Sequence, residues 1–415
     1  MRILLVTNYF EPETGAAASR LTRLAYALHE RGHDVTVLTS LPHYPQGRIL
    51  DNYQGRLVVT EDRAGLRVIQ TWLWPTASPR ISRRLMSQLS FMLTVSLRGI
   101  ASQRPDVLLI EAQPPFTGLA GVFLAGVKRR PYVLNISDLW PDHLLAVGAV
   151  KATSLSYRVA RRIVDFTYRR AGGIAAMSPV WAEQIQTYAP CQKNIRVIYN
   201  GLDLERFRPG LATADFRERY KLGTARLISF IGTFATQYDL ETMLAVAHRF
   251  VGREDVRFMF VGQGSQREIV RRAVERGDPA NLVWLDWLAA DEVRLAWNAS
   301  YLTYWSMHPH ELYHGTIPAK LYEALACGVP VAAMTAGVSA DIIRSSGAGV
   351  AVVPGSGPEA LAEAVGRLLD DDAYHQECSY AARRYAEAHF DYQQVITAYE
   401  TLLADVISIS RPVKT

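Results

Sequence analysis

The chain of 415 residues is 49% hydrophobic and 20% charged, which excludes an intrinsically disordered protein. It is longer than one hydrophobic core usually organises, so we expect two domains of roughly 200 residues each. Its 45 Lys and Arg against 40 Asp and Glu give a net charge of +5, which is too small to indicate nucleic acid binding.

The three cysteines, Cys191, Cys327 and Cys378, form no CxxC pair, which argues against a disulfide framework or a thiolate metal site. They indicate a reducing compartment. The apolar run that opens the chain is too short for a secretory signal, and no stretch reaches the roughly 18 to 20 apolar residues of a membrane span. We therefore expect a cytoplasmic protein, with peripheral contact to the inner face of the cell membrane left open.

In the first half, short apolar runs alternate with segments of helical period, which predicts a parallel sheet with helices between its strands. Between the first two runs, Leu21, Leu24 and Leu28 share one face of a helix, and Gly32 stands where its C-terminus favours a left-handed residue. The runs are Ile3 to Val6, Val35 to Leu38, Val68 to Thr71, Val107 to Ile110, Tyr132 to Ile136, Ile174 to Met177 and Val197 to Tyr199.

Positive charge gathers in this half of the chain. No acidic residue lies between Asp62 and Asp106, and residues 151–170 hold six cations against Asp165 alone. Within the first interval, Leu85, Leu89, Leu93 and Leu97 form an i, i+4 ridge beside Arg80, Arg83 and Arg84. The segment 80–104 resembles a helix that binds an anionic membrane surface, and a helix packed in the core is the alternative.

The alternation restarts after a linker at residues 201–210, which predicts a second doubly wound domain. We expect domains at residues 1–200 and 201–390, facing each other across a cleft, with a C-terminal helix at about 391–409 that packs back on the first. The second set of runs is Leu227 to Ile231, Val256 to Val261, Leu282 to Trp284, Tyr301 to Tyr304, Val329 to Ala333 and Val350 to Val353.

The segment His314 to Val331 carries the strongest chemical signal. Pro318 suits a first helical turn, and Gly328 ends the helix before the next strand. Lys320 places a full cation at a helix start, which is unfavourable unless an anion binds there, and a diphosphate would resolve the conflict. Glu323, one turn later, has two acceptor oxygens for ribose hydroxyls. An ordinary surface helix is the alternative.

This segment, Pro-Ala-Lys-Leu-Tyr-Glu-Ala-Leu-Ala-Cys-Gly-Val-Pro-Val, resembles the donor-binding motif of the retaining glycosyltransferases of family 4, which have the GT-B fold. Two further stretches agree in order and spacing. Residues 197–209 resemble the interdomain NG-x-D-x-x-x-F-x-P signature, and Phe260 to Gly264 resembles the strand and glycine turn of the second domain. A branch of the family that acts in polysaccharide and lipid-linked glycan assembly is similar in its Pro-x-Lys and Asp-Leu-Trp-Pro sequences.

The resemblance implies which residues bind the donor and which act in catalysis. Asp138 ends a strand where the family often has a His-Asp pair near the transferred sugar, and it is the first-domain candidate for catalysis, with Lys320 and Glu323 in the second. The loop Glu11 to Ala17 resembles one that approaches donor and acceptor, although a plain turn explains it equally well. The implied donor-binding residues are Gly15, Gly232, Thr233, Gly262, Trp287, Thr316, Ile317, Pro318, Ala319, Lys320 and Glu323.

The chain departs from the family pattern at three places. The first glutamate of the E-x7-E motif falls on Gly315, so Glu311 is the nearest carboxylate that could replace it. The Arg and Lys common after the first strand of the donor domain fall on Thr233 and Tyr238, which leaves more of the phosphate charge to Lys320. Ser137 takes the place of the histidine before Asp138.

The resulting hypothesis is a retaining hexosyl- or N-acetylhexosaminyl-transferase. The donor is a nucleotide diphosphate sugar, with a UDP-sugar favoured over a GDP-sugar, and the acceptor is a glycan or a polyprenyl-linked glycan at an anionic membrane surface. No metal or other cofactor is expected, because His308, His310 and His314 do not share one helical face. A GT-B-fold nucleotide-sugar epimerase and a non-catalytic donor-binding subunit of a glycan-assembly complex remain as alternatives.

Overall fold

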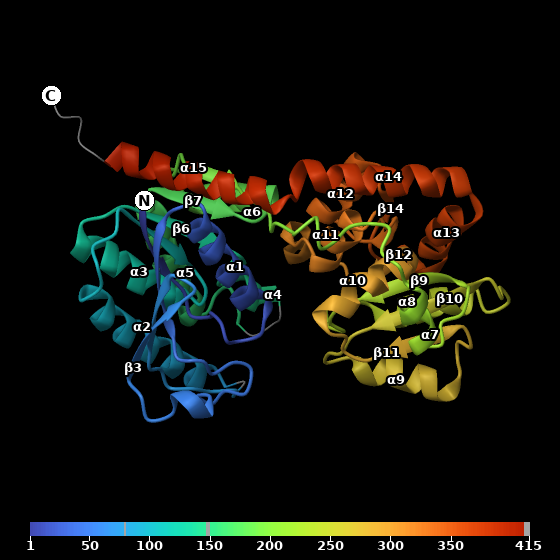
Figure 1. The fold of residues 1–415 in the computed structure, drawn as a ribbon, viewed down its shortest axis with the longest axis horizontal. Coiled ribbons are helices and arrows are strands. Elements are labelled where there is room, and N and C mark those ends of the chain that lie inside the picture. The colour runs from blue at the N-terminus through green and yellow to red at the C-terminus, as the bar shows by residue number, and fades with distance from the viewer. Residues whose placement is uncertain (79, 147–149, 411–415) are drawn as a thin grey trace. The chain divides into compact units, whose positions relative to one another are not determined.

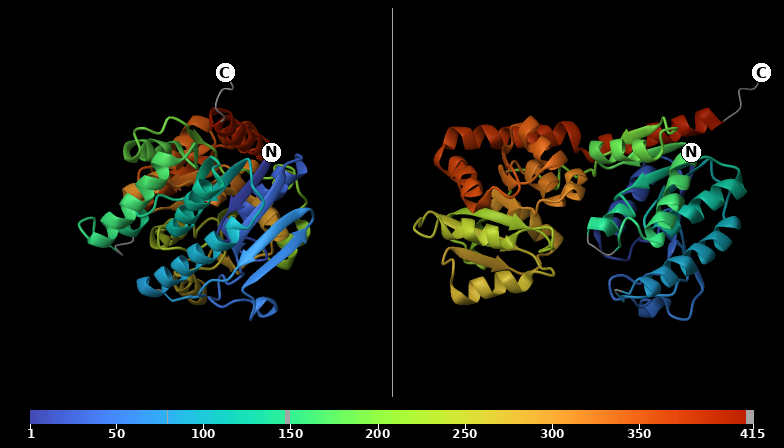
Figure 2. Two further views of the ribbon diagram at one scale, coloured as in Figure 1. Left: turned by 90° about the vertical axis from the view of Figure 1, so that its left-hand side faces the viewer. Right: turned by 180° about the vertical axis from the view of Figure 1, so that it is seen from behind.

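A computed structural model describes residues 1–78, 80–146 and 150–410, apart from the side chains of residues 143, 146 and 312. The chain forms two compact units. The N-terminal unit comprises Met1–Asn200 together with the C-terminal residues from Val395, and the C-terminal unit comprises Gly201–Gln394. In each unit helices cover both faces of a sheet (Figures 1 and 2).

The N-terminal unit is built on an eight-stranded sheet in the order β3-β4-β2-β1-β5-β6-β7-β8. All neighbours are parallel except β3 and β4, which form an antiparallel pair at one edge. The strands are β1 (Arg2–Val6), β2 (Asp34–Ser40), β3 (Val58–Arg63), β4 (Leu66–Thr71), β5 (Val107–Glu111), β6 (Tyr132–Ile136), β7 (Gly173–Ala176) and β8 (Ile195–Val197).

Seven α-helices and one short 3-10 helix accompany this sheet in the described part of the chain. The first of them begins at Ala16 and ends near Gly32, whose φ of 86° confirms the predicted left-handed residue. The helices are α1 (Ala16–Glu30), η1 (Asp51–Tyr53), α2 (Ile81–Ile100), α3 (Pro115–Lys128), α4 (Asp142–Ala146), α5 (Leu155–Arg170), α6 (Pro179–Tyr188) and α15 (Tyr392–Ser410).

Helix α15, from the end of the chain, packs on the N-terminal unit. The Tyr399 hydroxyl donates a 2.8 Å hydrogen bond to Asn135 Oδ1 in β6. A Cβ at Gly172 or Gly173 would lie within 3 Å of Val406 or Leu402, so glycine at the start of β7 lets the helix approach the sheet closely. Val395, Ile396 and other apolar side chains of the helix are buried there.

Six of the seven predicted strands of the N-terminal unit are present where expected, because their apolar runs are buried on both faces of the sheet, as parallel strands require. The strand predicted at Val197 to Tyr199 is wrong in its bounds: β8 begins two residues earlier, at Ile195, ends at Val197, and has no buried side chain. The sequence missed β3. Its residues, Val-Val-Thr-Glu-Asp-Arg, include only Val59 as a buried side chain. A strand at an open edge can keep polar side chains in solvent, so it lacks the continuous apolar run by which the others were recognised.

Helix α2 packs on the core by one side, as the alternative of a core helix predicts, whereas its leucine ridge faces solvent. Leu85, Leu89, Leu93 and Leu97 are exposed, while Phe91 and Val95 on the other side of the helix are fully buried. Among the described helices, α2 included, none is both long and apolar enough to span a bilayer.

The C-terminal unit is built on a six-stranded, all-parallel sheet in the order β11-β10-β9-β12-β13-β14. Its strands match the predicted apolar runs. They are β9 (Arg226–Ile231), β10 (Val256–Val261), β11 (Leu282–Leu285), β12 (Ser300–Ser306), β13 (Val331–Met334) and β14 (Gly349–Val352). The helices are α7 (Ala214–Arg219), α8 (Leu240–His248), α9 (Arg267–Arg276), α10 (Ala290–Ala299), η2 (Glu311–Gly315), α11 (Ala319–Ala326), α12 (Gly337–Ser346), α13 (Gly357–Asp370) and α14 (Asp372–His389).

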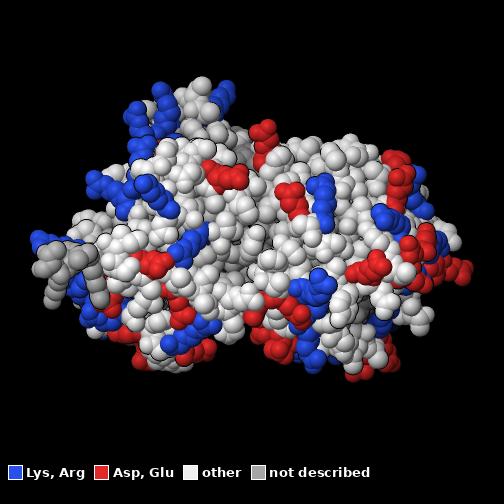
Figure 3. Space-filling view, turned by 90° about the horizontal axis from the view of Figure 1, so that it is seen from above, with Lys and Arg blue, Asp and Glu red and all other residues white. Residues whose placement is uncertain are grey.

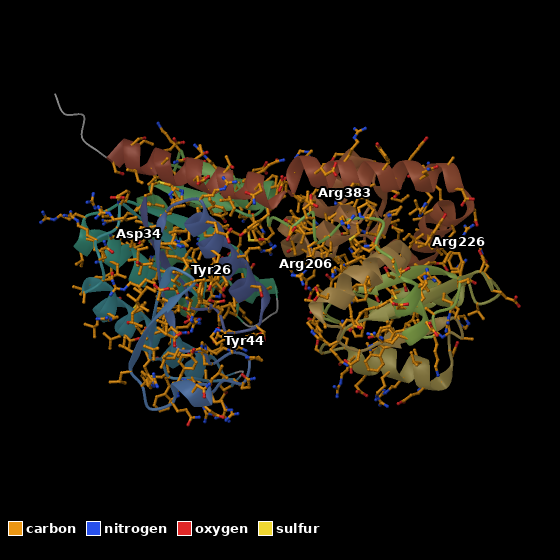
Figure 4. All side chains as sticks on the ribbon, in the orientation of Figure 1. Tyr26, Asp34, Tyr44, Arg206, Arg226 and Arg383 are labelled. Atoms are coloured by element: carbon orange, nitrogen blue, oxygen red, sulfur yellow. The ribbon has the colours of Figure 1, made fainter. Side chains whose placement is uncertain are left out.

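The linker predicted at residues 201–210 lies on helix α14 of the C-terminal unit. Arg383, labelled in Figure 4, donates from one guanidinium nitrogen to the carbonyl oxygens of Phe207 at 2.9 Å and Ala326 at 2.7 Å. A charged donor that satisfies several backbone acceptors at once holds the segment in place more firmly than neutral contacts would.

Candidate functional site

The predicted donor-binding segment runs through the C-terminal unit from η2 to α11. Pro318 precedes the helix as its N-cap residue, with an extended backbone (φ −64°, ψ 143°), instead of standing inside the first turn as predicted. Its carbonyl oxygen accepts the Leu321 N–H at 2.9 Å and so starts the helical hydrogen bonds. Gly328, with φ 67°, follows the helix and turns the chain toward β13.

Lys320, in the first turn of α11, is 4% exposed. Its ammonium nitrogen lies 3.3 Å from the centre of the Phe230 ring and 3.9 Å from that of the Tyr238 ring. No described residue offers it a hydrogen-bond acceptor. Burial lowers the pKa of Lys320 well below its usual range, and the nearby Glu323 carboxylate opposes that shift only in part.

Tyr238, one of the positions at which the family commonly carries a cation, is therefore part of the Lys320 environment. The Tyr238 ring is buried and also packs edge-on against Phe230. Sequence reasoning identified Tyr238 only as a lost charge. Its contact with Lys320 depends on the fold, because residues 82 positions apart meet at the carboxyl end of β9.

Glycines make the turns beside Lys320 possible. Gly232 and Gly262, which follow β9 and β10, have φ angles of 137° and 134°. A Cβ at Gly262 would lie 2.1 Å from the Gly232 carbonyl oxygen, and one at Gly232 would lie 3.4 Å from Cε of Lys320. A side chain at Gly262 cannot be accommodated. The two glycine turns therefore present backbone atoms, and no side chains of their own, next to the Lys320 ammonium group.

Glu323 is held by a residue that the sequence did not single out. Trp297 of α10 is fully buried, and its indole nitrogen donates a 2.8 Å hydrogen bond to Glu323 Oε2. Burial, and then the charge of Glu323, raise the pKa of the neighbouring Cys327 thiol to about 12. The Trp297 hydrogen bond thus orients the carboxylate, while the Glu323 side chain remains partly exposed.

The remaining predicted donor residues lie on the loops around this helix start. Trp287 is 69% exposed, and its backbone N–H donates at 2.6 Å to Asp286, which also accepts from Gln263. These two hydrogen bonds hold the pKa of Asp286 below its usual value. Among the others, Thr233 and Ala319 are exposed, and Thr316 and Ile317 are partly exposed.

The histidine-rich loop before α11 is packed closely at its end. A Cβ at Gly337 would lie 2.2 Å from the His314 carbonyl oxygen, and Gly337 has φ 61°. Gly315 is buried and Glu311 is exposed in η2. Over the described residues, no group of three or more His, Cys, Asp or Glu side chains is arranged to hold a metal ion.

In the N-terminal unit, the predicted glycine-bearing loop is held by a buried carboxylate. Glu13 Oε1 accepts the backbone N–H groups of His43 at 2.7 Å and Tyr44 at 2.8 Å. Gly15, the N-cap of α1, has an extended backbone with φ 166°, so a positive φ is not its reason for being glycine. A Cβ at this position would lie 3.3 Å from the ring of Tyr44, which Figure 4 labels, so the ring would have to move slightly to accept a side chain here.

Asp138, the candidate for catalysis in this unit, follows β6. Its carbonyl oxygen accepts a 2.7 Å hydrogen bond from the Gln113 side chain, and its own side chain is partly exposed. Ser137, which takes the place of the family's histidine, donates to Glu111 instead. The predicted residue therefore lies at the carboxyl end of a central strand, where ligands of such sheets bind.

Sequence reasoning missed the buried polar network beneath Asp138. Glu111 is 1% exposed and accepts from Arg20 of α1 at 2.9 Å and from Asn135 of β6 at 2.7 Å. Asn135 in turn accepts from Tyr399. The carboxylate of Glu111 at a strand end was the available signal, but its partners come from α1, from β6 and from the turn that follows β6.

A pocket of about 370 Å³ opens at the same carboxyl edge of the N-terminal sheet. Arg84 of α2 and the aromatic residues Tyr9, His43 and Tyr44 give it a cationic and aromatic character. Its lining residues are Asn8, Tyr9, His43, Tyr44, Pro45, Gly47, Thr76, Ala77, Ser78, Arg84, Ser87, Gln88 and Pro114.

Residues 15–201 match the family described as "Glycosyl transferase 4-like domain", and residues 225–371 match "Glycosyl transferases group 1". The relatives include the 2-deoxystreptamine N-acetyl-D-glucosaminyltransferase of Streptomyces fradiae, which is 24% identical over 92% of this chain and 91% of its own length. A GDP-mannose-dependent alpha-mannosyltransferase of Mycobacterium tuberculosis has the same identity and the same coverage.

Solved structures show the fold. The sucrose-phosphate synthase of Thermosynechococcus elongatus has a TM-score of 0.75 at 17% identity and covers 98% of this chain and 99% of its own. HepE of Anabaena, in complex with UDP, has a TM-score of 0.73 at 15% identity and covers 97% of this chain and 100% of its own. With two parallel-sheet α/β units and both glycosyltransferase domain families matched, the chain belongs to the family 4 glycosyltransferases of the GT-B fold.

Proposed function

We propose that this glycosyltransferase moves a sugar, with retention of its anomeric configuration, from a nucleotide diphosphate sugar to a glycan or lipid-linked acceptor at a membrane surface. The observation that carries the donor site is the buried Lys320 ammonium group, which has no hydrogen-bond acceptor among the described residues. A buried cation without an acceptor is costly, and an anionic ligand removes that cost.

The donor diphosphate binds, in this proposal, at the start of α11. The unpaired N–H groups of the first helical turn and the Lys320 ammonium group both favour negative charge. Gly232 and Gly262 keep the neighbouring backbone bare, so the phosphates can approach it. Thr316, Ile317 and Ala319 complete the approach to the helix start.

The ribose and the base of the donor bind at two separate places near the start of α11. Glu323, oriented by Trp297, accepts hydrogen bonds from the two ribose hydroxyls. The exposed indole of Trp287 offers a flat apolar surface for the base. A UDP-sugar is the favoured donor, supported by the likeness to HepE, which was solved with UDP. A GDP-sugar is the alternative, supported by the GDP-mannose-dependent relative.

In the proposed reaction the bond between the anomeric carbon and the donor phosphate oxygen breaks as the acceptor hydroxyl attacks from the same face. The acceptor proton passes to the departing phosphate oxygen, and nucleoside diphosphate leaves. Lys320 and the helix start stabilise the negative charge that grows on the leaving group. No protein nucleophile is assigned. Asp138 is assigned to the acceptor side, where its carboxylate orients the attacking hydroxyl.

Contact with a membrane is assigned to α2. Its exposed leucines cover one side of the helix, and Arg80, Arg83 and Arg84 begin it. Apolar side chains would enter the headgroup boundary while the cations meet anionic lipid, each worth about 1 kcal/mol near the surface. Figure 3 shows, from above, that Lys and Arg also gather elsewhere over the N-terminal unit, with few acidic side chains among them.

The direct test is release of nucleoside diphosphate from a panel of UDP- and GDP-sugars, with and without membrane lipid. We expect one donor to be turned over by the wild type, and affinity for it to fall in Lys320→Ala and Glu323→Ala. Equal donor affinity in all three proteins would exclude this donor site. Turnover of the donor without any acceptor would identify an epimerase, and binding without transfer would identify a non-catalytic subunit.

Membrane contact has its own test, which is co-sedimentation with phosphatidylglycerol vesicles at low salt. The double variant Leu93→Ser with Leu97→Ser should bind less, whereas Val251→Ser with Val353→Ser, a matched pair of exposed apolar residues in the C-terminal unit, should not change. Equal binding by both pairs would contradict a role for α2.

A further inference from the structure

A second cavity, of about 570 Å³, lies on the N-terminal unit at the edge of the sheet where β5, β6 and β7 begin. Predicted acceptor residues such as Asp138 lie at the opposite, carboxyl edge. The end of α3, the end of α5 and the last turns of α15 line the cavity, which is open to solvent. Its lining residues are Asp106, Val122, Ala125, Gly126, Arg129, Arg130, Pro131, Tyr132, Arg170, Gly172, Ile407 and Ser410.

Three arginines of this lining, Arg129, Arg130 and Arg170, form no close ion pair with a carboxylate among the residues that the structure describes, although the charge of Arg130 helps to lower the pKa of Asp106. Asp106 is the acidic residue of the lining, and Arg2 occupies both of its oxygens. The Arg2 guanidinium donates to Oδ1 at 3.0 Å, and the Arg2 backbone N–H donates to Oδ2 at 2.8 Å. These contacts hold the pKa of Asp106 below its usual value, so it stays ionised and paired.

Arg130 is partly buried, whereas Arg129 and Arg170 are exposed. Arg130 has its Nε buried and, over the described residues, without a hydrogen-bond partner. Arg129 has a left-handed backbone with φ 51°, which is uncommon for a residue with a side chain. The guanidinium carbon of Arg170 lies 4.6 Å from the centre of the Phe166 ring.

The surroundings of the cavity add positive charge. Lys128, at the end of α3, is buried and donates to the Ser102 carbonyl at 2.8 Å. Burial and the neighbouring Arg104 lower the pKa of Lys128. The C-termini of α3 and α5 favour cations, which explains why arginines are found there. The helix ends do not, however, give Arg130 Nε a hydrogen-bond acceptor.

We propose that this cavity is a second anion site, separate from the donor site, that binds the phosphate group of a phosphate ester. Guanidinium groups pair with phosphate oxygens through two parallel hydrogen bonds, and three arginines line this one cavity. The cavity is larger than a phosphate ion, and Val122, Ala125 and Ile407 provide apolar wall for the organic part of the ester. A phospholipid headgroup and a free phosphorylated metabolite share this chemistry.

Arginine labelling by phenylglyoxal, read by peptide mass spectrometry on the full chain, tests the site directly. The protein is labelled in phosphate, in chloride of equal ionic strength, and with vesicles of phosphatidylglycerol or of phosphatidylcholine. We expect phosphate to slow labelling of Arg129, Arg130 and Arg170 at least threefold, with no change at the exposed Arg158. Repeating the experiment with Lys320→Ala removes any contribution from the proposed donor site.

Two matched double variants identify the source of the phosphate. Arg129→Gln with Arg170→Gln changes the cavity, and Arg158→Gln with Arg162→Gln removes the same charge from exposed positions of α5. A lipid headgroup is the ligand if phosphatidylglycerol vesicles slow labelling of the cavity arginines and if the Arg129/Arg170 double variant binds these vesicles more weakly than the Arg158/Arg162 double variant does. A soluble ester is the ligand if phosphate protects but the two vesicle types do not differ. The proposal is overturned if neither phosphate nor vesicles slow labelling at the three arginines relative to Arg158.

Discussion

The ammonium nitrogen of Lys320 lies 3.3 Å from the centre of the Phe230 ring, where no described residue gives it a hydrogen-bond acceptor. A desolvated cation gains up to about 2 kcal/mol from an aromatic ring. Removing an ammonium group from water costs several kcal/mol, so the ring does not offset the burial. The free protein therefore holds Lys320 at a cost that an anionic donor can relieve.

Replacing Lys320 by methionine should separate stability from donor binding. Methionine keeps the apolar stem and the contact with Phe230 but removes the charge, so we expect an unchanged or higher melting temperature. Nucleoside diphosphate affinity should fall about 10- to 100-fold, which corresponds to one charge-assisted hydrogen bond of about 1.5–3 kcal/mol. Calorimetric titration and thermal unfolding measure the two effects. Lys193→Met, at an exposed position, is the control, and a lower melting temperature with unchanged affinity would contradict the prediction.

The stability of the free protein should depend on pH through Lys320. Its folded-state pKa is lowered by burial, while the unfolded chain keeps the proton up to the ordinary value of about 10.4. Between those two values the unfolded state binds more protons, so the free energy of unfolding rises with pH. The stability advantage of Lys320→Met over the wild type should therefore shrink from pH 7 to pH 10. A constant difference across this range would show that Lys320 does not titrate abnormally.

The Tyr238 ring should position the Lys320 ammonium group for the donor. Tyr238→Phe keeps the ring and should bind nucleoside diphosphate as the wild type does. Tyr238→Leu removes a contact worth about 0.5–2 kcal/mol and should weaken binding about 2- to 30-fold. The lysine pKa, followed by nuclear magnetic resonance, should change only in Tyr238→Leu. A purely structural role would instead lower the melting temperature without changing that pKa.

Glu323 should determine recognition of the ribose. We expect the wild type to bind UDP about tenfold more tightly than 2′-deoxy-UDP, because one hydrogen bond to a charged acceptor is lost. Glu323→Ala should bind the two equally. Trp297→Phe removes the 2.8 Å hydrogen bond that orients the carboxylate and should give an intermediate ratio. An unchanged ratio in Glu323→Ala would remove the ribose assignment even if overall affinity fell.

The network below Asp138 should stabilise the N-terminal unit. Glu111→Ala removes the buried carboxylate that accepts from the Arg20 guanidinium at 2.9 Å. Breaking this buried ion pair should lower the free energy of unfolding by about 3–5 kcal/mol. Tyr399→Phe, which removes the hydroxyl that donates to Asn135 and also interacts with Arg20, should cost about 1–2 kcal/mol. Urea unfolding measures both. Exposed Tyr380→Phe serves as the control, and equal costs for the Glu111 and Tyr399 variants would contradict a charge-based network.

Local patterns in the sequence predicted most of the fold. Parallel strands buried on both faces, such as Val107 to Ile110 and Leu227 to Ile231, are continuous apolar runs, so the sequence alone predicts both sheets of this family 4 glycosyltransferase. The segment from Pro318 to Glu323 was recognisable for a similar reason. Its helix start, cation and carboxylate follow one another within six residues.

Contacts between distant segments were decided only by the tertiary structure. Nothing local to Lys320 indicates that it is buried against Phe230 and Tyr238, or that Trp297 holds Glu323. The arginine-lined cavity joins α3, α5 and α15, which are far apart in the chain. Periodicity and motifs reflect contacts between residues that are near one another along the chain. The burial of a side chain and the partner of each charge depend instead on which distant elements the sheet brings together.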